Sequence, residues 1–354
     1  MKNADLSLLT LATGLLFAGC NKGDETNNLT PTSEIITSLS SNVIVATYDD
    51  LASKAYQLEL SLETLKANPT TSNLENARQL WKETRSAWEQ SEGFLFGPVS
   101  SEDIDPGIDT WPVNFLELDS LLASTTTITP QYLAGLTQDA LRGFHPLEYI
   151  LWGQNGNKQA TDLTIKEMEY MVALGAYIRD RTSHLSSRWD INNSNSFRHE
   201  FEKAGNGSSA YSTRKDAMLE VVSAMQGICE EVADGKIEEP FFAQDPSLEE
   251  SPFSGNSIAD FTNNMRSIEN MYVGKYASDG KGIQDFVKNY NLSLDAEITQ
   301  KIAAAIAALQ NITVPFGEAI LTQPQQVANA QTAIRNLNES LEKLTPLIQQ
   351  RVTD

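Results

Sequence analysis

Cysteine, histidine and basic residues are all scarce in this chain. Two cysteines and three histidines occur among 354 residues, so a disulfide framework is excluded and stability must come from a hydrophobic core. Lys and Arg number 26 against 47 Asp and Glu, which gives a formal charge of −21. A surface of this sign repels phosphate groups, so nucleic acid is excluded as a partner. Nucleophile elbows, glycine-rich phosphate loops and C-x-x-C pairs are also absent.

The sequence has no long apolar run. A short apolar run near its start is typical of an export signal. Residues 6–17 are mainly apolar but too short to span a membrane, and Lys2 precedes them. They lead into Leu16-Phe17-Ala18-Gly19-Cys20, a lipobox. We therefore expect residues 1–19 to be a lipoprotein signal peptide and Cys20 to carry the lipid that anchors the protein to the membrane.

The polar residues after Cys20 predict a flexible tether over residues 20–35. Cys-Asn-Lys-Gly-Asp-Glu at its start resembles the acidic export signals of surface lipoproteins in Bacteroidetes-type cells. The expected location is the cell envelope, as an outer-membrane lipoprotein that is either periplasmic or surface-exposed. Cys229 has no cysteine left to pair with, and its apolar neighbours predict a buried, inert thiol.

From Ile36 onward the apolar residues recur at helical spacing, and alternating β-branched runs are scarce. The sequence therefore predicts an all-α protein. A stretch rich in Asn, Ser and Gly at 190–212 marks a boundary between an N-terminal bundle, 36–200, and a C-terminal bundle, 201–354. The two halves have a similar order of elements, which suggests a duplication. Residues 93–114 contain three residue pairs that interrupt helices, Gly97-Pro98, Pro106-Gly107 and Trp111-Pro112. They predict an irregular loop, and a loop of this length is usually functional.

One short motif stands out within the first half, Gly143-Phe144-His145-Pro146-Leu147-Glu148. On a helix, His145 and Glu148 share one face. Pro146 fits only the first helical turn, so His145 should lie at the helix N-terminus, where the helix dipole favours the neutral, metal-binding imidazole. The alternative is that His145 caps its helix and Glu148 makes a buried hydrogen bond.

This G-x-H-x-x-E motif, continued by Tyr149-Ile150-Leu151-Trp152-Gly153, resembles the signature of the imelysin-like family of bacterial envelope proteins, also classed as M75 peptidases. Residues 88–98 resemble the family's W-x-x-S/T-E-x-F/Y segment, and residues 108–114 resemble its I-N/D-x-W-P element. Residues 250–260 and 274–276 resemble its second-half pattern. Ile258 stands where many members have a histidine, so a second imidazole ligand is missing.

The resemblance implies two related helical bundles packed together, with the motif near their junction. It also implies a site built on His145, Glu148, Glu92 and Asp109. Supporting positions in the motifs are Gly143, Trp111, Pro112 and Trp152, although the tryptophans are equally typical of packing anchors and Asp109 of a turn cap.

One imidazole and two or three carboxylates suit iron or another divalent metal. A zinc peptidase needs about three ligands and a general base, and no H-E-x-x-H is present. A di-iron site needs two E-x-x-H units, whereas here the order is reversed and occurs once. We therefore expect no ferroxidase and assign no catalytic residue.

The first functional hypothesis is an envelope lipoprotein implicated in iron uptake that binds a metal ion or a metal-bearing ligand. Its partners would be the membrane, through Cys20, and other iron-uptake components of the envelope. An alternative is an M75-type metallopeptidase with His145 and Glu148 as metal ligands. A further alternative is a module that binds a peptide or glycan without metal.

Overall fold

The computed structural model describes residues 29–353, and every regular element among them is a helix. The prediction of an all-α protein is confirmed. Residues 1–28 lie outside the described part, so the predicted signal peptide and the lipidation site at Cys20 cannot be located in it. Within the described residues, no helix is both long enough and apolar enough to cross a membrane.

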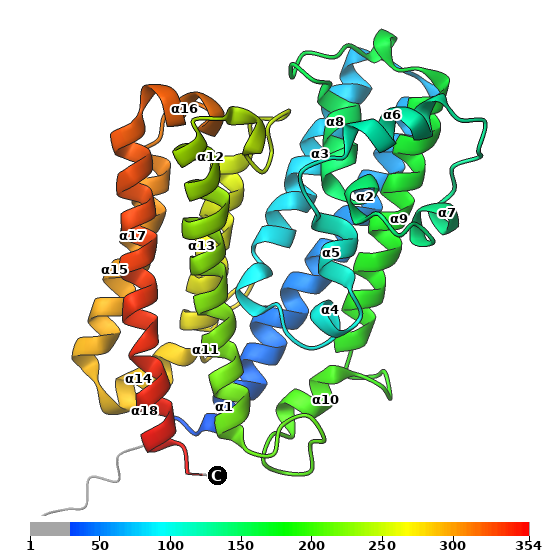
Figure 1. The fold of residues 1–354 in the computed structure, drawn as a ribbon. Coiled ribbons are helices and arrows are strands. Elements are labelled where there is room, and N and C mark those ends of the chain that lie inside the picture. Colours follow the sequence, from blue (N-terminus) through cyan, green and yellow to red (C-terminus); the bar gives the residue numbers. More distant parts are fainter. Residues whose placement is uncertain (1–28, 354) are drawn as a thin grey trace, which may run out of the picture.

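Two groups of long helices lie side by side (Figure 1). The first group contains α2 (Ala46–Ala67), α3 (Thr71–Glu89), α8 (Phe144–Trp152) and α9 (Ile165–Trp189). The second group contains α11 (Arg214–Glu230), α13 (Ser257–Val273), α15 (Leu292–Gln310) and α17 (Pro324–Glu342). The buried apolar side chains of both groups belong to one core cluster, and α3 packs against α13 where the groups meet. The observed halves fit the expected pair of bundles, whereas the residue boundaries and the duplication stay predictions.

Shorter helices connect and cap these groups. The α-helices among them are α1 (Thr32–Ser38), α4 (Pro98–Ser101), α5 (Ile104–Asp109), α6 (Phe115–Ala123), α7 (Pro130–Ala134), α10 (Phe197–Glu202), α12 (Glu238–Ala243), α14 (Ile283–Tyr290), α16 (Phe316–Thr322) and α18 (Leu344–Arg351). The 3-10 turns are η2 (Glu92–Phe94), η3 (Asp139–Leu141), η4 (Ala160–Asp162) and η6 (Pro246–Leu248), and the π-helical segments are η1 (Leu39–Val45) and η5 (Glu231–Ile237).

Local sequence explains where the long helices begin. The Thr164 hydroxyl accepts a hydrogen bond from the backbone N–H of Glu167, and the Glu167 carboxylate accepts one from the backbone N–H of Thr164, a capping box that starts α9. Thr213 and Asp216 form the same box at the start of α11. These reciprocal bonds satisfy donors that a helix start would otherwise leave unpaired.

Two boundaries differ from the sequence interpretation. The first helix begins at Thr32, ahead of Ile36, and buries Ile35. The predicted irregular stretch 93–114 contains the helical turns η2, α4 and α5. These turns have three to six residues each, too few for an apolar periodicity to be visible. Cys229 is buried as predicted, and burial raises the pKa of its thiol.

Candidate functional site

The four residues proposed from the sequence lie in one buried polar network between the two halves. Asp109 ends α5, His145 and Glu148 lie in the first turns of α8, and Glu92 begins η2. All four side chains are buried. The structure thus brings together all four candidates, although their sequence positions span 57 residues from Glu92 to Glu148.

His145 is oriented by Asp109. Its Nε2 lies 3.0 Å from Asp109 Oδ1, while Asp109 Oδ2 accepts a hydrogen bond of 2.7 Å from Trp88 Nε1. Arg85 donates to Asp109 Oδ1 as well. Asp109 thus has Trp88, Arg85 and His145 around its two oxygens. A histidine that donates one ring nitrogen to a carboxylate has the other nitrogen available to bind metal, a common arrangement at metal sites.

Gly143 makes this contact possible. It has a φ of +93°, and a Cβ at this position would overlap the backbone carbonyl of Ile108. The absence of a side chain therefore lets the start of α8 lie directly against α5, which places His145 beside Asp109. Pro146 lies in the first turn of α8, as the sequence predicted.

Glu148 links α8 to the loop before α13. Its Oε1 accepts hydrogen bonds from the backbone N–H groups of Phe253 and Ser254, at 3.1 and 2.7 Å, and from the Ser254 hydroxyl at 2.6 Å. Its Oε2 has no hydrogen-bond partner and lies 3.9 Å from His145 Nδ1. One carboxylate oxygen is thus structural, and the other is left free beside the imidazole lone pair.

Glu250 brings a further carboxylate from the second half. Its Oε1 lies 2.8 Å from a terminal nitrogen of Arg85 and 2.8 Å from Lys236 Nζ, whereas its Oε2 has no hydrogen-bond partner. Asp109, His145 and Glu250 each offer a ligand-type atom within 4.8 Å of the others. Because both oxygens of Asp109 are already used, His145 Nδ1 and Glu250 Oε2 are the better available donors.

Glu92 belongs to an adjoining part of the same network. Its Oε2 accepts hydrogen bonds from Lys236 Nζ at 3.1 Å and from the side-chain amide of Asn264 at 2.7 Å. The same amide lies 2.5 Å from Glu89 Oε2. Glu89, Glu92 and Asp109 form a second group of ligand-type atoms within 4.8 Å of one another.

The network contains more negative than positive groups. Six buried carboxyl groups share this network with only two buried cations, Arg85 and Lys236. Five of them lie within 4.0 Å of a nitrogen of one or both cations, namely those of Glu89, Glu92, Asp109, Glu250 and Asp260, and the sixth is Glu148, beside His145. Burial raises the pKa of both Glu92 and Asp260 well above its usual range. An excess of buried carboxylates is costly unless it is neutralised by protons or by a bound cation.

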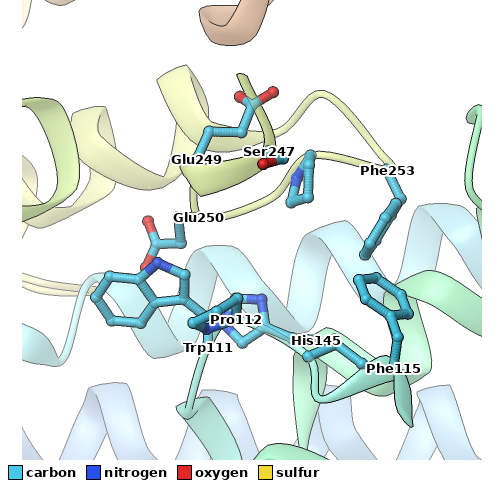
Figure 2. Close-up of a pocket in the computed structure, with 10 residues that line it drawn as sticks. Trp111, Pro112, Phe115, His145, Ser247, Glu249, Glu250 and Phe253 are labelled. Atoms are coloured by element: carbon cyan, nitrogen blue, oxygen red, sulfur yellow. The ribbon is translucent and has the colours of Figure 1, made fainter. Parts of the chain in front are cut away.

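A small cavity opens onto this network (Figure 2). It has a volume of about 20 Å³, which is room for about one water molecule or one ion. Polar lining comes from His145, Glu249 and Glu250. The walls are Trp111, Pro112, Val113, Phe115, Ser247, Pro252 and Phe253. Trp111 and Pro112 therefore line the cavity, whereas Trp152 does not and packs edge-on against Trp81.

These donors fit a metal ion on the evidence of the side chains themselves. Among the described residues, the buried ligand-type atoms left without a hydrogen bond here include His145 Nδ1, Glu148 Oε2 and Glu250 Oε2. An imidazole nitrogen with carboxylate oxygens is a suitable set for iron, manganese or zinc. His184 and His199 lie elsewhere, on the hollow lined by Glu102 and Arg188.

The chain matches the model of the imelysin family, peptidase M75, over residues 44–344. It belongs to that family. It is 32% identical to iron-regulated protein A of Synechococcus elongatus over 326 residues, which is 90% of this chain and 87% of that protein. The resemblance inferred from the motifs is confirmed.

Two solved structures share the imelysin fold. The crystal structure of a candidate iron-regulated protein A precursor from Parabacteroides distasonis aligns with a TM-score of 0.81 at 22% identity, covering 91% of this chain and 95% of that one. An imelysin-like protein from Psychrobacter arcticum aligns with a TM-score of 0.66 at 14% identity, covering 90% and 93%. At these identities the two structures establish the fold alone.

Five charged residues of the network were missed by the sequence analysis, namely Arg85, Glu89, Lys236, Glu250 and Asp260. Arg85 had a visible signal, because it occupies the apolar face of α3 that also carries Trp81 and Trp88. A charged residue in such a stripe needs a buried partner. Lys236 and Glu250 had weaker signals, since one lies in a π-helical segment and the other in a loop.

Proposed function

We propose that the protein binds a metal ion, or the metal of a metal-bearing ligand, at the junction of its two halves, and that this binding serves iron uptake in the cell envelope. The observation that supports this most directly is the group formed by Asp109, His145 and Glu250, whose ligand-type atoms lie within 4.8 Å of one another, with an unpartnered carboxylate oxygen on Glu250 and on Glu148. They occur in a network with an excess of carboxylates, next to a cavity of ion size.

Each residue has a distinct role in this proposal. His145 and Glu250 would bind the ion as members of the group that Asp109 completes, and Glu148 would contribute the free oxygen that lies beside His145 Nδ1. Asp109 would also hold the ring orientation of His145. Glu92 would contribute charge from the adjoining group. The bound metal would supply a positive centre able to hold a further ligand in the cavity.

The iron-related part of the proposal comes from the relatives. The proteins from Synechococcus elongatus and Parabacteroides distasonis both bear the name iron-regulated protein A. The proposal also includes two expectations from the sequence analysis. The protein would be attached to the membrane through a lipid on Cys20, and it would act with other iron-uptake components of the envelope.

Metal binding is favoured over peptide hydrolysis or peptide and glycan binding. A cavity of about 20 Å³ holds a single ion or water, whereas a ligand site for a drug-sized molecule has several hundred Å³. The free donor atoms are also better suited to an ion than to an extended chain.

The test is a titration of the chelator-stripped protein with Mn²⁺, followed by EPR of the free ion. We expect one ion per chain. His145→Ala should weaken binding by at least about a factor of ten, while the matched control His184→Ala, which removes an exposed histidine paired with Glu102, should leave it unchanged. Equal binding by the two variants would contradict the proposal.

Elemental analysis of protein purified without chelators then identifies the natural metal. A metallopeptidase would instead show chelator-sensitive cleavage of unfolded substrates that His145→Ala abolishes. That result would overturn the binding proposal.

A further inference from the structure

Lys236 lies at the centre of the acidic network although lysine is rarely buried. Its side chain is fully buried. Its Nζ lies 2.8 Å from Glu250 Oε1, 3.1 Å from Glu92 Oε2, 3.2 Å from Glu231 Oε1 and 3.9 Å from Glu89 Oε2. It also lies 5.6 Å from the centre of the Trp111 ring, which lines the cavity. The ammonium is therefore surrounded in the way a bound cation would be.

The backbone places Lys236 in this position by an unusual element. It belongs to η5, a π-helical segment between α11 and α12. The extra residue per turn of a π-helix shifts side chains out of the α-helical register, and such segments are frequent at functional sites. In η5 this shift accompanies a lysine whose ammonium meets carboxylates from α3, η2 and the loop before α13.

The carboxylates around Lys236 form a position with the properties of a cation site. Glu89, Glu92 and Glu250 are almost completely buried and converge from both halves of the molecule. Asn264 adds an amide that touches Glu89 and Glu92, and its own Oδ1 is buried without a hydrogen bond. Without the ammonium, Glu92 would lose its cationic partner and Arg85 alone would face Glu89 and Glu250, which is unfavourable in a buried place.

We infer that Lys236 is a built-in cation that fills a second cation position, formed by Glu89, Glu92 and Glu250, and so restricts the junction to one exogenous metal ion. The part of this inference that concerns the first ion, at His145, rests on the proposed function. The part that concerns the position filled by Lys236 does not. Glu250 is shared, because its Oε1 faces Lys236 while its Oε2 is free. Lys236 therefore sets both how many ions the junction holds and how strongly negative the first position is.

The experiment counts Mn²⁺ ions bound per chain before and after the ammonium is removed. Lys236→Met keeps a long flexible side chain but loses the charge. A second variant, Lys236→Met with Glu231→Gln, also removes the partly exposed carboxylate at the edge of the network, so its formal charge equals that of the unchanged protein. The control Lys82→Met removes a lysine that lies over Trp152, away from the cavity.

We expect one Mn²⁺ for the unchanged protein and for Lys82→Met, and two for both Lys236 variants. A folded Lys236 variant that binds the same number as the unchanged protein would overturn the inference. If the unchanged protein binds none and the double variant binds one, the built-in cation stands and the metal-binding proposal fails. A variant that neither folds nor refolds with added Mn²⁺ also overturns it, because a true cation position should accept a replacement cation.

Discussion

Glu148 is the residue at which the functional and the structural reading of the G-x-H-x-x-E motif give opposite expectations. Its Oε1 accepts three hydrogen bonds from Phe253 and Ser254, and its Oε2 is free beside His145 Nδ1. Glu148→Gln can keep the Oε1 contacts, because an amide oxygen also accepts hydrogen bonds. Glu148→Ala cannot, and it leaves two backbone N–H groups and a hydroxyl without their acceptor.

The magnitudes follow from these contacts. Leaving a buried donor unsatisfied costs about 1–3 kcal/mol, so Glu148→Ala should destabilise the ligand-free protein by about 2–4 kcal/mol. In a chain of this size that loss should lower the Tm by roughly 3–6 °C. Glu148→Gln should leave the Tm unchanged or raise it slightly, since it removes one of six crowded buried carboxyls.

Metal binding should respond differently from stability. The amide nitrogen of Glu148→Gln replaces the free oxygen that faces His145 Nδ1 and is able to donate a proton to it, which would cover the imidazole lone pair. We expect binding of Mn²⁺ to weaken by at least about tenfold in both variants. Thermal unfolding by circular dichroism and the Mn²⁺ titration provide the two readouts. A Glu148→Gln variant that is destabilised as much as Glu148→Ala and binds the ion normally would show that the motif is only scaffold.

Three further predictions test the electrostatics, the network and the anchor. Burial, together with the negative charge of Glu231, raises the pKa of Asp105 to about 6; its contribution to stability is therefore complete below about pH 4 and is lost as pH rises through about 6. Asp105→Asn should accordingly match the unchanged protein at pH 4 and exceed its stability by about 3 kcal/mol at pH 8, measured by denaturant unfolding, with the exposed Asp279→Asn as control. Arg85→Met should cost about 3–5 kcal/mol, because it leaves Asp109 and Glu250 without their guanidinium partner; a loss below 1 kcal/mol would mean that Arg85 does not neutralise them. Cys20→Ser should move the protein from the membrane fraction to the soluble fraction, and persistent membrane association would contradict lipid anchoring.

The fold class and the part of the site on α8 could be predicted from the sequence, because both depend on patterns among neighbouring residues. Helical periodicity and the break at Gly143 and Pro146 are properties of neighbouring residues, so α8 and the position of His145 could be inferred without tertiary contacts. The proximity of Asp109 depends on how α5 meets α8, and only the family resemblance pointed to it.

The other side of the site depends on long-range packing. Glu250 lies in a loop, and its partner Arg85 is 165 positions away. Lys236 lies in a segment whose π-helical register breaks the 3.6-residue pattern on which the helix prediction rests. In α3, by contrast, Arg85 and Glu89 continue the apolar face of Trp81 and Trp88, and a charge in that face is a local signal from which a buried network could have been predicted.

The placement of the free donor atoms has a mechanical consequence for the two halves. His145 and Glu148 belong to α8 in the first half, whereas Glu250 belongs to the loop that leads into α13 in the second. An ion bound to all three would add a connection across the junction, and binding would stabilise the junction by an amount that grows with the logarithm of ion concentration. Glu148 already accepts hydrogen bonds from Phe253 and Ser254 of the same loop. Removing the ion would therefore leave these hydrogen bonds between the halves in place and remove the contacts that the ion makes. Hydrogen exchange of the loop should therefore slow when Mn²⁺ is added and should not slow in His145→Ala.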